Sequence, residues 1–368
     1  MAPVFLDVFS LEQVYLWPRA YWHKNKNERQ ETILEDTIES WLIEKNDYLK
    51  LITGGPGIGK SSFSKMFAAK LSRNHDWDVF LIPLHLLALR NDFKAAVEEQ
   101  LSCWFDGFDL SKKERPFLLI LDGLDEIEMQ AGVKEAVRNF INQLVNKVAI
   151  LNNNPNQAVF KVILTGRDLA IEAAKDCNCN QDGQILHILP YNNKERQEWW
   201  NKYRNARGDE VIPLPPEFTN DNLKEITSQP LLNYLTITVW RDDPDYFIKN
   251  PNINQIYFRL FENVHERVWG QKIGGKEAPN LVGKLEFSQF MDVLEDVGLA
   301  IWHSNSRSVT QESINQRCTI SKTDQLLRKL EGGDKNGHGI DKLLLSFYFR
   351  GNEIKGEKTY EFTHKSFG

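Results

Sequence analysis

Short apolar runs alternate along the chain with longer stretches whose apolar residues recur every three or four positions. The runs predict buried strands at residues 48–53, 79–84, 117–121, 160–165 and 185–189. The longer stretches predict amphipathic helices, among them residues 34–42 and 133–148, whose apolar stripes are packing faces. Strands that alternate with helices in this way indicate an α/β fold with a parallel sheet and helices on both of its faces.

The pattern becomes mainly helical after about residue 190. Residues 194–203 predict an amphipathic helix with Trp199 and Trp200 in the core, and a proline-rich stretch at 213–216 predicts a loop. Farther on, a helical stripe contains Leu285, Phe290, Leu294, Leu299 and Trp302. Two apolar segments, 343–349 and 359–363, flank the polar stretch 351–358. This pattern predicts a β-hairpin in which the polar stretch is the turn.

Composition narrows the class of protein. A chain of 368 residues is long enough for about two or three domains, and 41% hydrophobic with 26% charged residues is ordinary for a soluble globular protein. The net charge of −6 argues against a dominant surface for nucleic acid or for anionic membranes. No apolar run is long enough to span a bilayer, and the N-terminus does not resemble a signal peptide. We therefore expect a cytoplasmic protein that binds neither nucleic acid nor membranes.

A glycine-rich loop carries the strongest chemical signal. It has the form G-x-x-x-x-G-K-[ST] and consists of Gly54, Gly55, Pro56, Gly57, Ile58, Gly59, Lys60 and Ser61, with Ser62 following. The loop lies between a predicted strand and a predicted helix, which is the setting of a phosphate-binding loop. Glycines let backbone N–H groups converge on phosphate oxygens. Lys60 is expected to reach the β- and γ-phosphates, and the Ser61 hydroxyl is expected to bind Mg²⁺.

A second motif follows at residues 117–127. Five apolar residues precede Asp122, so the carboxylate lies at the C-terminal end of a buried strand, where open α/β sheets bind ligands. We expect Asp122 to face the Mg²⁺ and phosphate site. Glu126 is the better candidate to activate the attacking water, and Asp125 is the next candidate.

These residues resemble the NACHT-type members of the STAND class of signalling ATPases. The sequence Asp122-Gly123-Leu124-Asp125-Glu126 is similar to the NACHT form of the Walker B motif. Residues 165–167, Thr-Gly-Arg, resemble the sensor 1 motif, in which Ser usually stands where this chain has Gly166. The resemblance implies that Arg167 senses the γ-phosphate.

Weaker matches follow in the family's order. Residues 223–235 resemble the helical-domain segment whose proline, here Pro230, lies beside the adenine. Residues 360–367 resemble the winged-helix motif whose histidine, here His364, contacts the β-phosphate of ADP. Each also has a plainer interpretation, because Pro230 is suited to begin a helix and His364 alternates with Phe362 as in a strand.

The resemblance implies four regions: a lead-in at 1–27, a NACHT nucleotide-binding domain at 28–190, a helical domain at 191–255 and a winged-helix domain at 256–368. Family members usually add an effector domain and a sensor of repeats. Neither is recognised here, and the terminal motif stops short of its helix, so we expect a truncated chain.

The function implied is a nucleotide-dependent switch. It would bind ADP when closed, exchange it for ATP with Mg²⁺, self-associate, activate an effector and hydrolyse ATP slowly. Compact motif spacing suggests a prokaryotic member, for which antiviral defence is an inference by family analogy. Two other classes stay open: a motor-like ATPase of the AAA+ type, and a DNA-binding regulator that uses the winged helix.

Overall fold

The computed structural model describes residues 9–25, 28–55, 57–74, 76–84, 115–124, 134–153, 158–167, 183–210, 213–219, 221–248, 253–266, 285–304, 308–326, 349–354 and 357–362. The chain divides into two compact units, residues 1–218 with 227–231, and residues 219–226 with 232–368. Within the described ranges, no helix combines the length and apolar character needed to cross a membrane.

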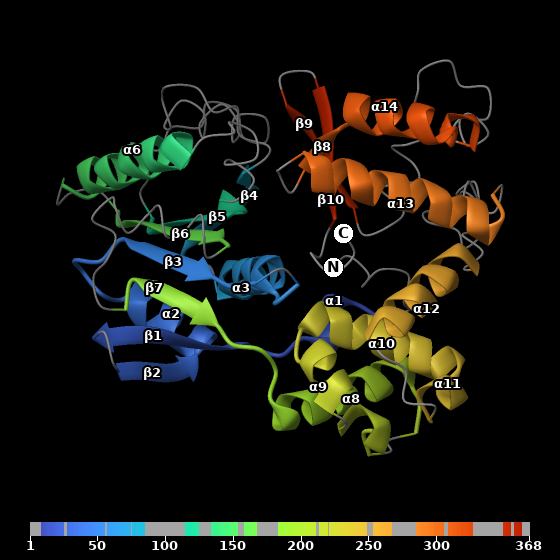
Figure 1. Ribbon diagram of the computed structural model, residues 1–368. Coiled ribbons are helices and arrows are strands. Elements are labelled where there is room, and N and C mark those ends of the chain that lie inside the picture. Colours follow the sequence, from blue (N-terminus) through green and yellow to red (C-terminus); the bar gives the residue numbers. More distant parts are fainter. Residues whose placement is uncertain are drawn as a thin grey trace. The chain divides into compact units, whose positions relative to one another are not determined.

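A seven-stranded sheet organises the first unit (Figure 1). In spatial order its strands are β2 (Glu28–Ile33), β1 (Arg19–Asn25), β7 (Ile185–Ile188), β3 (Leu49–Thr53), β6 (Phe160–Gly166), β5 (Phe117–Asp122) and β4 (Asp78–Pro83). The strands from β7 to β4 are parallel, and all of them lie where apolar runs predict strands. The predicted α/β fold with a mostly parallel sheet is thereby confirmed.

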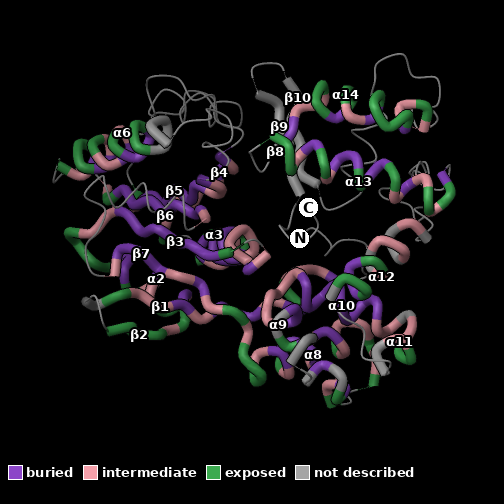
Figure 2. The backbone as a smooth tube through the Cα atoms, viewed as in Figure 1, coloured by how far each residue is buried: buried purple, intermediate pink, exposed green. Residues whose placement is uncertain are grey.

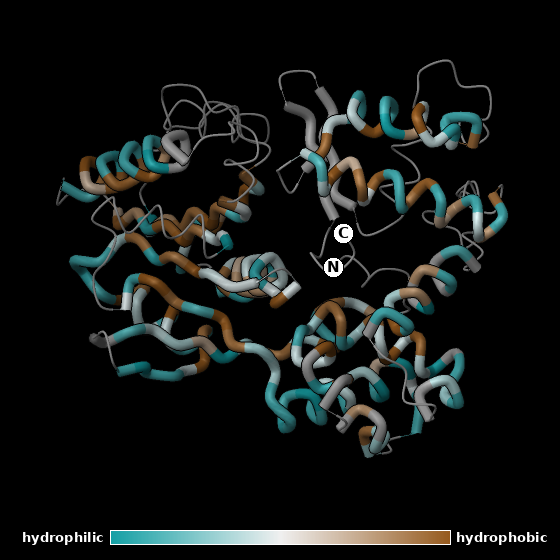
Figure 3. Tube along the Cα trace, viewed as in Figure 1, coloured by the Kyte–Doolittle hydropathy of each residue, from teal (hydrophilic) through white to brown (hydrophobic). Residues whose placement is uncertain are grey.

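An antiparallel pair extends this sheet at the β7 edge. β1 pairs with β7 on one side and with β2 on the other, although β1 lies in the segment interpreted from the sequence as a lead-in. Hydropathy gives little sign of the pair, because a strand near an edge buries only one face. Ala20 of β1 is fully buried, whereas β2 is almost entirely exposed and hydrophilic (Figures 2 and 3).

Helices cover both faces of the sheet. The helices of the first unit that the structure describes are α1 (Leu11–Val14), α2 (Leu34–Leu42), α3 (Lys60–Asn74), α6 (Lys134–Asn152) and α8 (Asn193–Arg207). Alternate residues of β3 face opposite cores, because successive strand side chains point to opposite faces. Leu51 packs in the core that α6 covers, and Ile52 packs in the core that α2 and α3 cover.

Local sequence explains the ends of α8. Asn192 and Glu195 form a capping box at its start, and Gly208 ends it in the left-handed conformation with φ 74°. Trp199 and Trp200 are buried in the same helix, as the amphipathic pattern predicts.

The second unit contains helices and a small sheet. Its described elements are α9 (Asp221–Thr227), α10 (Pro230–Asp242), α11 (Pro244–Ile248), α12 (Ile253–Glu266), α13 (Phe287–His303), α14 (Gln311–Ser321), β8 (Ser308–Thr310), β9 (Phe349–Ile354) and β10 (Glu357–Phe362), of which α9 and α10 share residues with the first unit. The strands pair in the order β8-β10-β9, all antiparallel. The winged-helix assignment of this region stays a prediction.

Two expectations for the second unit need correction. Leu285, Phe290 and Leu294 are buried, but Leu299 is 40% and Trp302 is 79% exposed, so the apolar stripe leaves the packed face near the end of α13. The predicted hairpin turn at 351–358 is too long, because β9 and β10 stay paired as far as Ile354 and Glu357. β9 is an edge strand, and polar residues are common on sheet edges.

Candidate functional site

The glycine-rich loop joins β3 to α3 at the C-terminal edge of the parallel strands. Gly57 and Gly59 have φ of 71° and 105°, a region in which residues with a Cβ atom are strained. A Cβ atom on Gly54 would lie 2.8 Å from Ile58 Cγ2. The three glycines are therefore required by backbone conformation and by close approach.

Lys60 is the first residue of α3, and its side chain lies over the loop. Its Nζ donates to the carbonyl oxygens of Gly54 at 2.7 Å and Gly55 at 3.1 Å. Ser61 and Ser62 follow in the first turn and are partly exposed. The first N–H groups of a helix lack intrahelical partners, so a cation and these N–H groups together make an anion-binding site.

Asp122 is held at the adjacent strand end by a hydroxyl group. The Thr165 Oγ1 donates to Asp122 Oδ1 at 2.5 Å and accepts from the Gly123 N–H at 3.2 Å. Asp122 and Thr165 are partners in the β5–β6 register, and Thr165 is fully buried. Among the described residues, Oδ2 of Asp122 has no hydrogen-bond partner, so one carboxylate oxygen is fixed and the other is available.

The donor set fits Mg²⁺. A carboxylate oxygen from Asp122 and a hydroxyl oxygen from Ser61 are the hard ligands that Mg²⁺ prefers, and Mg²⁺ usually takes few protein ligands together with phosphate oxygens. The Ser61 hydroxyl also makes no hydrogen bond to any residue in the described ranges.

Other predicted site residues meet at the same edge. Gly166 pairs with Thr53, the residue before the glycine-rich loop. Arg167 therefore follows β6 at the same end of the parallel strands as the loop. Pro230 is the first residue of α10, and the N–H of Leu231 donates to the Gly57 carbonyl at 3.3 Å. Pro230 thus begins a helix, as its plainer interpretation requires, and the favoured contact with adenine stays a prediction. Pro56, Asp125, Glu126 and His364 lie outside the described residues.

Sequence reasoning did not assign the role of Thr165 toward Asp122. In the sequence, Thr165 is only the first position of the segment that resembles sensor 1, and the resemblance gives the functional role to Arg167. A signal was present, because a threonine and an aspartate at the ends of two neighbouring parallel strands can meet when their register matches. That register is a tertiary property, which the apolar runs do not specify.

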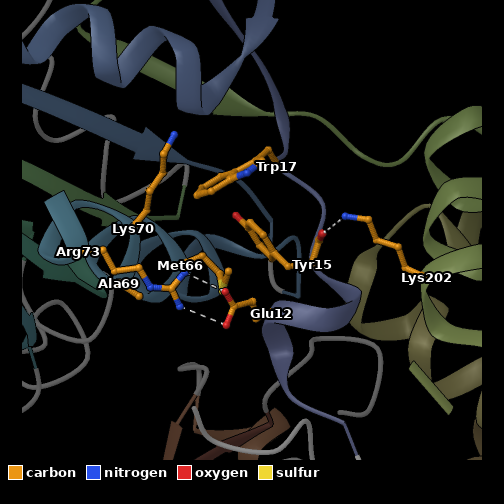
Figure 4. A pocket seen from close by; sticks show the side chains of 8 residues that line it. All are labelled: Glu12, Tyr15, Trp17, Met66, Ala69, Lys70, Arg73 and Lys202. Carbon is orange, nitrogen blue, oxygen red and sulfur yellow. Dashed lines mark hydrogen bonds and ion pairs between the residues drawn. The ribbon is translucent and has the colours of Figure 1, made fainter. Parts of the chain in front are cut away.

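A pocket of about 220 Å³ lies beside α3 (Figure 4). Its lining residues are Glu12, Tyr15, Trp17, Met66, Ala69, Lys70, Arg73 and Lys202. Lys70 Nζ lies 2.5 Å from both Glu35 and Glu39, and Arg73 is paired with Glu12. Lys202 donates to the Tyr15 carbonyl, and burial raises the pKa of the Tyr15 phenol well above its usual value. The cations of this pocket are thus committed to protein partners, and we assign it no nucleotide.

The strand–loop–helix, the parallel sheet and the Asp122 site define a P-loop NTPase domain. Residues 48–207 match the family profile described as NACHT domain, and this segment is therefore a NACHT domain. The NACHT resemblance deduced from the motifs is thereby confirmed for this part of the chain. None of the curated proteins compared with the chain matches it.

Similar solved structures include Cdc6p from Pyrobaculum aerophilum, with 12% identity over 91% of this chain and 89% of that chain and a TM-score of 0.36. DnaA from Aquifex aeolicus bound to AMPPCP has 11% identity over 84% and 90%, with a TM-score of 0.35. ORC from Drosophila bound to DNA has 11% identity over 90% and 82%, with a TM-score of 0.38. TM-scores this low do not add support to the fold assignment, which rests on the strand order and the glycine-rich loop.

Proposed function

We propose that the chain is a nucleotide-dependent switch that binds ADP in one state and exchanges it for ATP. The observation that carries the proposal is the complete phosphate loop, with Lys60 at the start of α3 and a fixed carboxylate, Asp122, at the neighbouring sheet edge. In this proposal the loop N–H groups and Lys60 bind the phosphates. Bound Mg²⁺ would neutralise phosphate charge, with Ser61 and Asp122 as its protein ligands.

Hydrolysis is proposed to be slow and to reset the switch. Glu126 would orient the attacking water, with Asp125 as the next candidate, and Arg167 would contact the γ-phosphate. A γ-phosphate can shift a conformational equilibrium only if it binds the two states with different affinity. In the closed ADP state, His364 would contact the β-phosphate and help to lock that state. Self-association of the ATP-bound form and a role in antiviral defence rest on family analogy.

Turnover and light scattering on the same preparation test this proposal. We expect ADP and Mg²⁺-ATP to bind, turnover to be slow, and scattering to rise with ATP but not with ADP. Glu126→Gln should keep ATP binding, suppress hydrolysis and prolong the ATP-dependent scattering, because a water-activating carboxylate acts mainly in the transition state. Fast turnover with constitutive assembly would instead favour a motor-like ATPase. Hydrolysis at the wild-type rate in Glu126→Gln would exclude Glu126 as the catalytic residue.

The DNA-binding alternative has a separate test. Drosophila ORC is bound to DNA in the structure cited above, but its TM-score of 0.38 does not extend that property to this chain. The net charge of −6 also disfavours a phosphate-backbone partner. We expect no salt-dependent binding to duplex DNA in a fluorescence anisotropy titration; strong binding that falls steeply with salt would support the alternative.

A further inference from the structure

The residues that lead into α10 are attached at three points. We call Thr227–Leu231 the strap, and it belongs to the first unit. The Tyr191 N–H donates to the Ser228 carbonyl at 2.7 Å, and Arg196 Nη1 donates to Thr227 Oγ1 at 2.9 Å. At the other end, the Leu231 N–H donates to the Gly57 carbonyl at 3.3 Å. The strap therefore joins the start of α8 to the phosphate loop.

Arg196 is an unusual anchor, because it is a buried cation whose partners are neutral. Its side chain is 2% exposed, and Nη1 also donates to the Phe218 carbonyl at 2.7 Å. Nη2 donates to Asn193 Oδ1 at 2.6 Å, while the buried Nε has no hydrogen-bond partner among the described residues. Burial lowers the pKa of the guanidinium. Burying a charge without a carboxylate partner costs stability. Arg196 instead fixes positions, because its planar guanidinium, carried by α8, donates to both Phe218 and Thr227.

The other end of the strap depends on the phosphate loop itself. The first N–H groups of a helix need acceptors from outside the helix, and for Leu231 of α10 that acceptor is Gly57. Gly57 has a φ of 71° within the glycine-rich loop. A change in the orientation of the Gly57 peptide therefore alters the acceptor at the start of α10. α10 continues from the strap into the second unit, beginning at Leu232.

We propose that the strap transmits nucleotide occupancy of the phosphate loop to α10, and that Arg196 is the positioning residue that anchors it. The proposal rests on the nucleotide binding proposed above and names the contact through which that binding acts. Coupling of this kind is reciprocal: if a bound nucleotide stabilises the Leu231 hydrogen bond, an intact strap must strengthen nucleotide binding by the same factor. Arg196 would thus influence affinity without touching the nucleotide.

Substitutions at Thr227 and Arg196 test the strap. Thr227→Val removes the hydroxyl that accepts from Arg196 at nearly constant volume, and Thr227→Ser keeps a hydroxyl. Arg196→Met removes the fork. We expect Thr227→Val and Arg196→Met to weaken ADP binding about fivefold or more in calorimetry, with Thr227→Ser close to wild type. Hydrogen exchange should show the Leu231 amide more protected with ADP in the wild type, and less so in the two weakened variants.

A matched control separates positioning from general destabilisation. Lys161 is another fully buried cation of the first unit, and it donates to the backbone carbonyls of Trp41 and Glu44, which lie outside the strap. Lys161→Met should lower the melting temperature and leave ADP affinity unchanged. If Thr227→Val lowers the melting temperature but leaves ADP affinity and the protection of the Leu231 amide unchanged, the strap proposal is wrong. A wild-type chain that binds no nucleotide would instead overturn the proposed function, and the strap proposal with it.

Discussion

Two lysines of the first unit make the same kind of hydrogen bond at opposite ends of the parallel strands. Lys60 follows β3 at its C-terminal end and donates to the carbonyls of Gly54 and Gly55. Lys161, near the start of β6, donates to the carbonyls of Trp41 and Glu44, and its Nζ lies 4.5 Å from the Trp41 ring centroid. Both ammonium groups donate to backbone carbonyls, so these hydrogen bonds alone do not distinguish the two lysines.

Their surroundings distinguish them. Lys161 is fully buried, and its acceptors are carbonyls at the end of α2, where a cation is favoured by the helix dipole. Lys60 is partly exposed and lies on a glycine loop whose geometry admits a ligand. A buried lysine with fixed acceptors stabilises the fold, whereas a lysine held on an open loop can exchange its acceptors for phosphate oxygens. Substituting each lysine should therefore affect different measurements.

The largest expected effect is on nucleotide affinity in Lys60→Ala. Losing the cation should weaken Mg²⁺-ATP binding by on the order of 3 kcal/mol, about a hundredfold, because no other described side chain occupies this position on the loop. Calorimetry gives the affinity and thermal unfolding gives the stability, which should change little. Unchanged affinity in Lys60→Ala would remove Lys60 from the site.

Next in size is the loss of stability in Lys161→Met. The variant keeps most of the aliphatic stem but removes the ammonium donor from the carbonyls of Trp41 and Glu44, which should cost about 2 kcal/mol in the free energy of unfolding. Urea denaturation measures this cost, and ADP affinity should stay at the wild-type value. A variant as stable as the wild type would show that water or other groups satisfy the two carbonyls.

A smaller effect is expected on catalysis in Thr165→Val. Without the hydroxyl, Asp122 Oδ1 loses its 2.5 Å partner, so the carboxylate is less well oriented for Mg²⁺. ATP turnover should fall about tenfold, a typical loss for a residue behind a metal ligand, and a higher Mg²⁺ concentration should be needed for half-maximal rate. Thr165→Ser, which keeps the hydroxyl, is the control. Equal ATP turnover in Thr165→Val and Thr165→Ser would show that other contacts orient Asp122.

The smallest expected effect is a pH dependence of the free energy of unfolding that depends on Lys161. Burial lowers its pKa to about 8, below the usual lysine value that the unfolded chain would have. Between these two pKa values the unfolded state binds more protons than the native state, so stability rises with pH in that window. The stability of wild type relative to Lys161→Met should increase from pH 8 toward pH 10 by on the order of 1 kcal/mol. A difference independent of pH would show that Lys161 stays protonated in its site.

Local pattern was enough to predict several parts of the molecule. The apolar run that ends at Asp122 and the glycine-rich loop both specify their conformation within about ten residues of sequence. The parallel strands, α3 and the burial of Trp200 follow from the same kind of information. The antiparallel strand β1 was not predicted, because its alternation is weak and its partner β7 is distant along the chain.

The sequence by itself determined the phosphate loop, the strand that carries Asp122 and the α/β class, because each depends on neighbouring residues and on backbone conformations that only certain residue types allow. Tertiary structure alone decided that Thr165 holds Asp122, that Arg196 meets Thr227, and that the Gly57 carbonyl accepts from Leu231. These contacts join segments about 30 to 170 residues apart. Their existence depends on strand register and helix packing, which are set by the whole core and not by any local pattern.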